Sequence, residues 1–422
     1  MATRNRVIYQ SEAVYCTQNV DFSGVQTGYV DNLDLDRVQS CNYSFNIGRT
    51  DVNQFGQLGA IDRIITESPS VSFDSSYLLA NLSNEKKLGF WVTNSGEAVF
   101  KSCITDLVDS TTYAYQKNFY VLQAKEGKDA DQTSKNPAST ASSGNFEAVI
   151  GIGNAGLTSY SVEAAVGGFP TVSFAAEGLN INFINDVGAG ATRSTAGPNK
   201  GQRRPFVVSG INPAINPVDG TRIERNITLP APSGSASDTA AGSVSVLRPG
   251  DITLNLAKQV DDGIIGAATT TSMQAPDYAG ADIADAHIQS FNISFDMSRS
   301  PIEQLGNKFA YARLIDFPIT ISLSVDAVIS DLTTGSLAEV IDCDDKFDAR
   351  IALGSPECGA TTAKAANYIL KGLKLDSQSF SLGMGDNKTV SLSFTSQIGG
   401  PEQSGMGLFM SGYYPSYVGV PQ

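Results

Sequence analysis

The sequence has few of the residues from which catalytic and metal sites are built. Histidine occurs once, at His287, which excludes a multi-histidine metal site and a histidine-containing catalytic triad with a spare orienting residue. The five cysteines lack a C-x-x-C pair, so their spacing does not suggest zinc. Cys343 and Cys358 are close enough in sequence for a disulfide to be considered, but free thiols in a reduced compartment are the simpler expectation. We therefore expect no enzyme activity, cofactor or metal.

Long apolar runs and positive charge are also scarce. No stretch approaches the roughly 20 apolar residues of a membrane helix, and residues 1–15 lack the apolar core of a signal peptide. Lys and Arg number 29 against 43 Asp and Glu, and a net charge of −14 repels a phosphate backbone. The basic runs Glu85-Lys86-Lys87 and Gln202-Arg203-Arg204 are short, lack interleaved aromatics and are expected to be solvated. The sequence predicts a soluble chain that binds neither membranes nor nucleic acid specifically.

Glycine and small polar residues are abundant instead. Hydrophobic residues make up 41% of the chain and charged residues 17%, a balance typical of a folded globular protein. The 40 glycines suit turns between short strands, whereas each interior glycine costs a helix roughly 1 kcal/mol. A length of 422 residues exceeds what one hydrophobic core usually organises. We expect a mainly β protein with two domains.

Two stretches of the sequence, 250 positions apart, are closely similar. VQSCNYSFNIGRTDVNQFGQLGAIDRII, from Val38, aligns without a gap on IQSFNISFDMSRSPIEQLGNKFAYARLI, from Ile288. About 11 of roughly 28 positions are identical, where composition alone would give about two. The identical polar residues include Asn42 with Asn292, Arg49 with Arg299, Gln54 with Gln304 and Arg63 with Arg313.

Strand patterns extend the repeat at both ends. Pro69 and Pro318 each precede an alternating run, and after Pro318 the apolar residues from Ile319 to Val325 alternate with Thr and Ser. This alternation is typical of a strand with one buried face. A weaker match joins GLTSYSVEAAVGGFPTVSFAAEG, from Gly156, to LDSQSFSLGMGDNKTVSLSFTSQIG, from Leu375, each with the pattern strand, turn, strand.

These patterns predict two copies of one β-rich domain, at residues 1–185 and 246–422. The Gly-, Pro- and Ser-rich segment 186–245 is expected to be a linker or long hairpin. The first copy has an N-terminal arm and a long loop at 127–144. Each copy is expected to hold one short helix, around Glu97–Leu107 and Ser336–Ile341.

Two further motifs have a structural and a functional interpretation. Gly151, Gly153 and Gly156 form a G-x-G-x-x-G string, but a dinucleotide site needs a helix after it, and the following sequence matches a strand pair in the other copy. Asp342, Asp344, Asp345 and Asp348 lack the spacing and turn glycine of an EF-hand, so we expect a solvated loop.

The run NIGRTDVNQFGQLGAIDRIITESPSVSF, with its second copy, resembles the tail tube proteins of tailed bacteriophages. The resemblance implies a β-sandwich or barrel-like domain in each copy, and sixfold rings stacked around a channel through which viral DNA passes without specific binding. Some long-tailed phages have a tube subunit with two such domains, so the resemblance implies a homotrimeric, pseudo-hexameric ring. It further implies a virion protein assembled in the bacterial cytoplasm, with terminator, tape measure and baseplate or tip proteins as partners.

The matched polar residues have two possible roles. Asn42, Arg49, Gln54 and Arg63, with their second-copy equivalents, either hold the shape of their own loop or form the inter-domain contacts repeated around the ring. Arg49 and Arg299 are the better interface candidates, because a guanidinium makes several directed hydrogen bonds. The alternative function is another β-sandwich virion protein that binds a receptor or carbohydrate, for which Phe409–Tyr417 is the candidate aromatic cluster.

Overall fold

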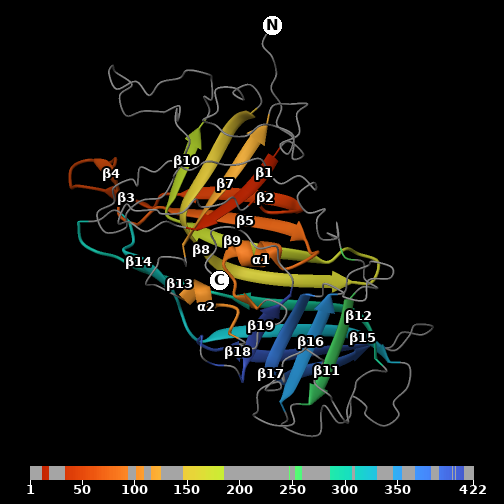
Figure 1. Cartoon of the computed structure of the whole chain (residues 1–422). Coiled ribbons are helices and arrows are strands. Elements are labelled where there is room, and N and C mark those ends of the chain that lie inside the picture. The colour runs from red at the N-terminus through yellow and green to blue at the C-terminus, as the bar shows by residue number, and fades with distance from the viewer. Residues whose placement is uncertain are drawn as a thin grey trace.

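The structure is a computed structural model dominated by β-strands (Figure 1). It describes residues 12–18, 34–93, 101–108, 116–124, 146–184, 247, 252–258, 286–306, 309–329, 346–353, 366–381, 389–401, 403 and 405–412. The predicted linker 186–245, the loop 127–144, the helix Ser336–Ile341, both Cys343 and Cys358, and the Tyr residues of the C-terminal cluster lie outside the described residues. We call the described residues 12–184 the first half and 252–412 the second half.

Apart from β6, which has no described equivalent in the second half, the strands of the two halves follow one another in matching order. In the first half they are β1 Glu12–Gln18, β2 Val38–Asn46, β3 Arg49–Val52, β4 Asp62–Ile65, β5 Ser70–Leu78, β6 Val92–Thr93, β7 Lys117–Ala124, β8 Phe146–Ala165, β9 Thr171–Gly178 and β10 Asn180–Ile184. In the second half they are β11 Ile252–Lys258, β12 Ala286–Asp296, β13 Arg299–Ile302, β14 Ala312–Ile315, β15 Ile319–Ile329, β16 Phe347–Leu353, β17 Ala366–Ser381, β18 Thr389–Ile398 and β19 Gly407–Ser411.

Strand pairing has the same order in both halves. In the first half β2 pairs with β5, β5 with β9 and β9 with β8, while β8 also pairs with β7 and β10, and β7 with β1. In the second half β12 pairs with β15, β15 with β18 and β18 with β17, while β17 also pairs with β16 and β19, and β16 with β11. A separate two-stranded hairpin follows β2 and β12, namely β3–β4 and β13–β14. Both hairpins project from the same side of the molecule (Figure 1).

The long strands β8 and β17 bend, and the two ends of each strand pair with different neighbouring strands. Asn154 in β8 and Gly372 in β17 both have a left-handed backbone, with φ of 55° and 66°. The amide N–H of Asn154 donates to Asn118 Oδ1 of β7, and that of Gly372 donates to Asp348 Oδ1 of β16, both at 3.0 Å. The same bend is therefore held by the same kind of hydrogen bond.

In each half the hydrophobic core lies between the strands that pair with the two ends of the bent strand. In the first half Phe73 of β5 stacks on Phe119 of β7, with ring centroids 4.7 Å apart, and Phe174 of β9 lies 5.9 Å from Phe119. In the second half Phe347 of β16 meets Phe394 of β18 at 6.0 Å. The predicted alternation after Pro318 is confirmed, because the apolar residues from Ile319 to Val325 are buried and the Thr and Ser residues between them are not.

The described helices differ from the two that were predicted. α1 is Ser83–Leu88, ends at Gly89 with φ of 102°, and had no counterpart in the sequence-based expectation. α2 is Thr105–Val108 and overlaps only the end of the predicted helix Glu97–Leu107. Part of the expected N-terminal arm is also regular structure, because Glu12–Gln18 is β1 and pairs with β7 along its whole length.

Candidate assembly surfaces

The two halves are joined edge to edge by β8 and β12, which pair antiparallel over seven residues of each strand (Figure 1). Ile293 of β12 lies opposite Val162 of β8, and both side chains are completely buried. The neighbouring pair, Phe295 and Tyr160, is also buried, with ring centroids 5.5 Å apart. We call this pairing, with the side chains packed on it, the internal seam.

The hairpin β13–β14 lies across the internal seam. Nε of Arg299 donates to the Leu157 carbonyl of β8 at 2.9 Å, and its Nη1 donates to the Arg313 carbonyl at 3.0 Å. Arg313 pairs with Glu177 of β9, with Nη1 and Oε1 3.1 Å apart. A Cβ atom on Gly156 would lie 2.7 Å from Arg299 Nε, so this contact requires glycine in β8. The hairpin of the second half therefore makes directed contacts with the first.

A buried carboxylate in α1 also connects the halves. Oε1 of Glu85 accepts hydrogen bonds from Tyr77 at 2.7 Å, Tyr160 at 3.0 Å and Tyr368 of β17 at 3.3 Å. Burial raises the pKa of Glu85, and the three hydroxyl donors oppose that rise. The arrangement favours a Glu85 carboxyl group that keeps its proton to a higher pH than a solvated carboxyl group does. Its hydrogen bond with Tyr368 ties β17 to the first half.

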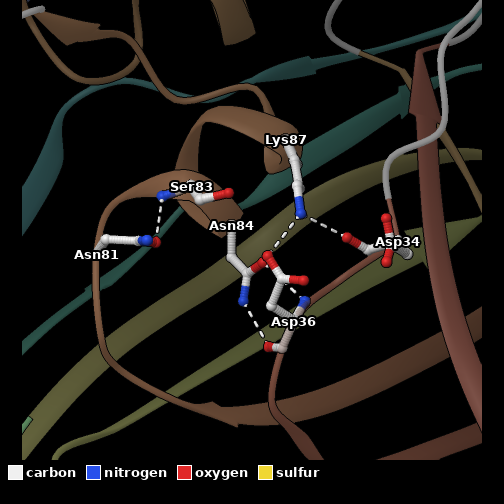
Figure 2. Close-up of polar contacts among 6 residues, drawn as sticks. All are labelled: Asp34, Asp36, Asn81, Ser83, Asn84 and Lys87. Carbon is white, nitrogen blue, oxygen red and sulfur yellow. Dashed lines mark hydrogen bonds and ion pairs between the residues drawn. The ribbon is translucent and has the colours of Figure 1, made fainter. Parts of the chain in front are cut away.

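A second polar cluster holds the start of β2 against α1 (Figure 2). Nζ of Lys87 donates to the Asp34 carbonyl at 2.6 Å and to Asp36 Oδ2 at 2.8 Å. Asn84 makes two hydrogen bonds with the backbone of Asp36, at 2.8 and 3.0 Å. The expectation that Glu85-Lys86-Lys87 is solvated is wrong, because all three residues are buried. Asp348, expected in a solvated loop, is likewise buried in β16.

The strands equivalent to those of the internal seam, β2 and the C-terminal part of β17, carry exposed residues. β2 is the end strand of the described sheet order, with β5 as its partner, and Tyr43 and Phe45 are 40% and 45% exposed. The C-terminal part of β17 pairs with β18 and, among the described strands, with no other, and Phe380 is 52% exposed. The hairpin β3–β4 carries Phe55 and Leu58, which are fully exposed.

One face of the sheet is polar from end to end. A row of hydroxyls crosses it from β2 to β18, in which each residue lies opposite the next: Ser40, Ser76, Ser173, Ser161, Ser294, Ser322 and Thr395. Carboxylates on this face are Asp74, Glu163, Glu177, Asp296 and Asp326. A hollow of about 480 Å³ lies over β2, β5 and β9 and is lined mainly by Ser, Asn, Asp and Glu. The face offers a polyanion hydrogen-bonding groups but little positive charge.

The matched polar residues occupy different surroundings in the two halves. Arg299 and Arg313 lie at the internal seam, and Asn292 lies opposite Glu163 of β8 on the polar face. Their first-half equivalents are exposed: Arg63 pairs with Asp51 of its own hairpin at 2.6 Å, and Arg49 and Asn42 lie on the surface. Gln54 donates to Gln57 within the β3–β4 loop, at 3.0 Å, and Gln304 is exposed in the equivalent loop. Contacts between subunits by these residues stay a prediction.

The chemical motifs singled out in the sequence are part of the fold. Gly151, Gly153 and Gly156 lie within β8, so the helix that a dinucleotide site requires does not follow them. Within the described ranges no group of His, Cys, Asp and Glu residues is arranged to hold a metal ion. Among the helices that the structure describes, none is long and apolar enough to cross a membrane. Phe409 of the C-terminal aromatic cluster is buried in β19.

Comparison with known proteins gives matches among solved structures but none to a protein family or curated sequence. Among solved structures, a chain of the SPP1 tail tube, determined as a hybrid structure by solid-state NMR and cryo-EM, is similar over 40% of this chain and 80% of its own length. The sequence identity is 13% and the TM-score is 0.25, values too low to indicate a function by themselves.

Proposed function

We propose that this protein is a structural, non-catalytic virion subunit that polymerises with copies of itself into the tail tube of a bacteriophage. The observation that carries the proposal is the internal seam, a contact between equivalent halves whose two surfaces have exposed equivalents on β2 and on the C-terminal part of β17. A contact surface of this kind adds units head to tail and closes into a ring when the rotation allows.

The proposed subunit consists of two tandem tube domains, at residues 1–185 and 246–422, joined by the segment 186–245. The repeated strand pairing supports this division. Within the proposal, each internal seam supplies one contact of the ring and each subunit boundary supplies another. A pseudo-sixfold ring then contains three subunits, and three heterologous boundaries alternate with three internal seams.

The polar face of the sheet is proposed to line the channel. DNA that moves through a tube must not adhere to its wall, and a surface of hydroxyls, amides and carboxylates gives phosphate no cluster of cations to bind. The chain as a whole carries a net charge of −14, which has the same sign as the DNA. Viral DNA is therefore a passing molecule in this proposal and not a specifically bound ligand.

Stacking of rings requires surfaces away from the ring seam. The tips of the two hairpins carry exposed apolar residues, Phe55 and Leu58 in the first and Leu305 in the second. Because both hairpins project from the same side of the molecule (Figure 1), we propose that they contact the next ring. Terminator, tape measure and baseplate or tip proteins are proposed as partners at the tube ends, and assembly is proposed to occur in the bacterial cytoplasm.

Electron microscopy of the purified full-length protein after concentration tests the proposal. We expect rings with an open channel and pseudo-sixfold projection, and tubes at higher concentration, with mass measurements giving three subunits per ring. Rings of six full chains would contradict the tandem-domain ring, and a protein that stays monomeric at every concentration and in virions would contradict the tube function. Capture by immobilised carbohydrates without polymerisation would favour the receptor-binding alternative instead.

A further inference from the structure

We propose that β2 of one subunit pairs antiparallel with the C-terminal part of β17 of the next subunit, in the register of the internal seam. This inference rests on the proposed function, because it names the surfaces by which copies of the chain join. The proposed opposite positions are Asn42 with Ser381, Tyr43 with Phe380, Ser44 with Ser379, Phe45 with Gln378, and Asn46 with Ser377. The occupant of each open edge is a second copy of this chain.

The register follows from the equivalence of the strands in the two halves. β3 and β13 begin at Arg49 and Arg299, so the segments that carry β2 and β12 are offset by 250 positions. For β8 and β17 the offset is 218 positions, because the pairing of each with its neighbour is interrupted at the same place, between Leu157 and Ser159 in β8 and between Leu375 and Ser377 in β17. Transferring the β12–β8 register by these offsets gives the proposed pairs.

The residues at the open edges have the exposure expected of a seam that is not yet formed. Tyr43, which is 40% exposed, corresponds to Ile293, which is fully buried, and Phe45, at 45%, corresponds to Phe295, at 3%. On the other edge Phe380 is 52% exposed, whereas its equivalent, Val162, is buried. In the proposed register Tyr43 and Phe380 lie directly opposite each other. Each edge thus supplies an aromatic side chain that the other edge would cover.

β2 lacks two of the features that protect an edge strand from pairing. Its nine residues, VQSCNYSFN, include no charged residue and no proline. The strand is also held in place before any partner arrives, by pairing with β5 along its length and by the Lys87 cluster at its start (Figure 2). A preorganised strand loses little conformational freedom on binding, which favours association.

The second seam differs from the first where the hairpin docks. Lys374 occupies the position in β17 that Gly156 occupies in β8. In the proposed seam Arg49 would therefore contact the Lys374 side chain, whereas Arg299 packs against the backbone of a glycine. Thr395 stands where β9 has Glu177, and Arg63 pairs with Asp51 of its own hairpin instead. The strand pairing is therefore transferred but the ion pair is not, and the boundary between subunits is expected to separate more readily than the internal seam.

Engineered disulfides test the register directly. The full-length double variant Ser44→Cys/Ser379→Cys is assembled, oxidised and analysed by denaturing electrophoresis without reductant. We expect covalent dimers and trimers, with the trimer as the largest major product. The matched control, Ser44→Cys/Ser377→Cys, displaces one cysteine by two positions on the same face of β17, and it should give at least tenfold less cross-linked product. Single variants and the native chain report any contribution of the native cysteines.

Each result supports or overturns the inference. Efficient cross-linking of the first pair alone supports it, whereas equal cross-linking of both pairs, or of the control alone, overturns the register. If the Ser44→Cys/Ser379→Cys protein forms tubes that never cross-link, the β2–β17 seam is wrong and the tube function stands. If the native chain forms neither rings nor tubes, the proposed function and this inference fail together.

Discussion

The segment from β2 to β4 and the segment from β12 to β14 are similar in sequence and opposite in environment. Arg313 is buried at the internal seam and its side chain is 10% exposed, whereas Arg63, its equivalent, is 67% exposed. Phe295 and Phe45 differ in the same direction. The second-half residues are covered because their partner strand belongs to the same chain. In the proposed ring, the next subunit would cover the equivalent residues of the first half.

Truncating one phenylalanine in each segment should separate folding from assembly most clearly. Phe295→Ala removes a buried ring that packs on Tyr160 and Phe90, so the free energy of unfolding of the subunit should fall by about 3–5 kcal/mol. Phe45→Ala should change it by less than about 0.5 kcal/mol and should weaken assembly. Urea unfolding and sedimentation velocity measure the two effects. Equal destabilisation of the subunit by both substitutions would contradict the comparison.

Replacing Lys87 should loosen the start of the exposed strand β2. Lys87→Met leaves the Asp34 carbonyl and the Asp36 carboxylate without their donor, and a loss of about 2–3 kcal/mol in unfolding free energy is expected. Hydrogen exchange of the β2 amides should accelerate before that of β12. The double variant Lys87→Met/Asp36→Asn is the control, because it removes the stranded charge and should recover part of the loss. Unchanged exchange in β2 would show that the cluster does not hold this strand.

Charge reversal of the equivalent arginines should act on different equilibria. Arg299→Glu removes hydrogen bonds to two carbonyls and places a carboxylate near Glu177, so the subunit should lose about 1–2 kcal/mol of stability. Arg49→Glu should leave the unfolding free energy within about 0.5 kcal/mol of the native value and raise the concentration needed for assembly. Thermal melting of the unassembled protein and light scattering distinguish the two. A large drop in melting temperature for Arg49→Glu would assign that residue to its own domain.

The internal seam should also be more sensitive to pH than the proposed boundary between subunits. Because the pKa of Glu85 in the folded protein lies above its usual value of 4.5, unfolding releases a proton as the pH rises past that value, and stability falls with increasing pH. Glu85→Gln removes this dependence. Urea unfolding from pH 4.5 upward should show a smaller decline in stability for the variant than for the native protein, by at most one proton in slope. Parallel curves would mean that Glu85 is ionised in the folded state.

The repetitive part of the fold could be predicted from the sequence because its signals are local. Alternation after Pro318 identified the buried face of β15, and the gapless match from Val38 to Ile288 identified β2 and β12 as equivalent strands. The strand pairs of the weaker match, β8 with β9 and β17 with β18, show the same local pattern of strand, turn and strand. These features depend on neighbours in sequence, which a single chain displays.

The polar contacts within the core could not be predicted because their partners are remote. Glu85 and Tyr368 are separated by 283 positions, and Lys87 and Asp34 by 53, so a short charged run was indistinguishable from a solvated surface. The string Gly151–Gly156 raised the question of a cofactor site, but the reason for its last glycine lies in Arg299 of the other half. Only the folded chain brings these groups together.

The internal seam also bears on how fast a ring can form. Two halves on one chain meet at an effective concentration set by the segment that joins them, whatever the concentration of protein. In a ring of three subunits, half of the contacts therefore exist before any collision between molecules. Ring formation then depends on encounters among three bodies and not six, which makes nucleation less sensitive to dilution when only a few chains have been synthesised.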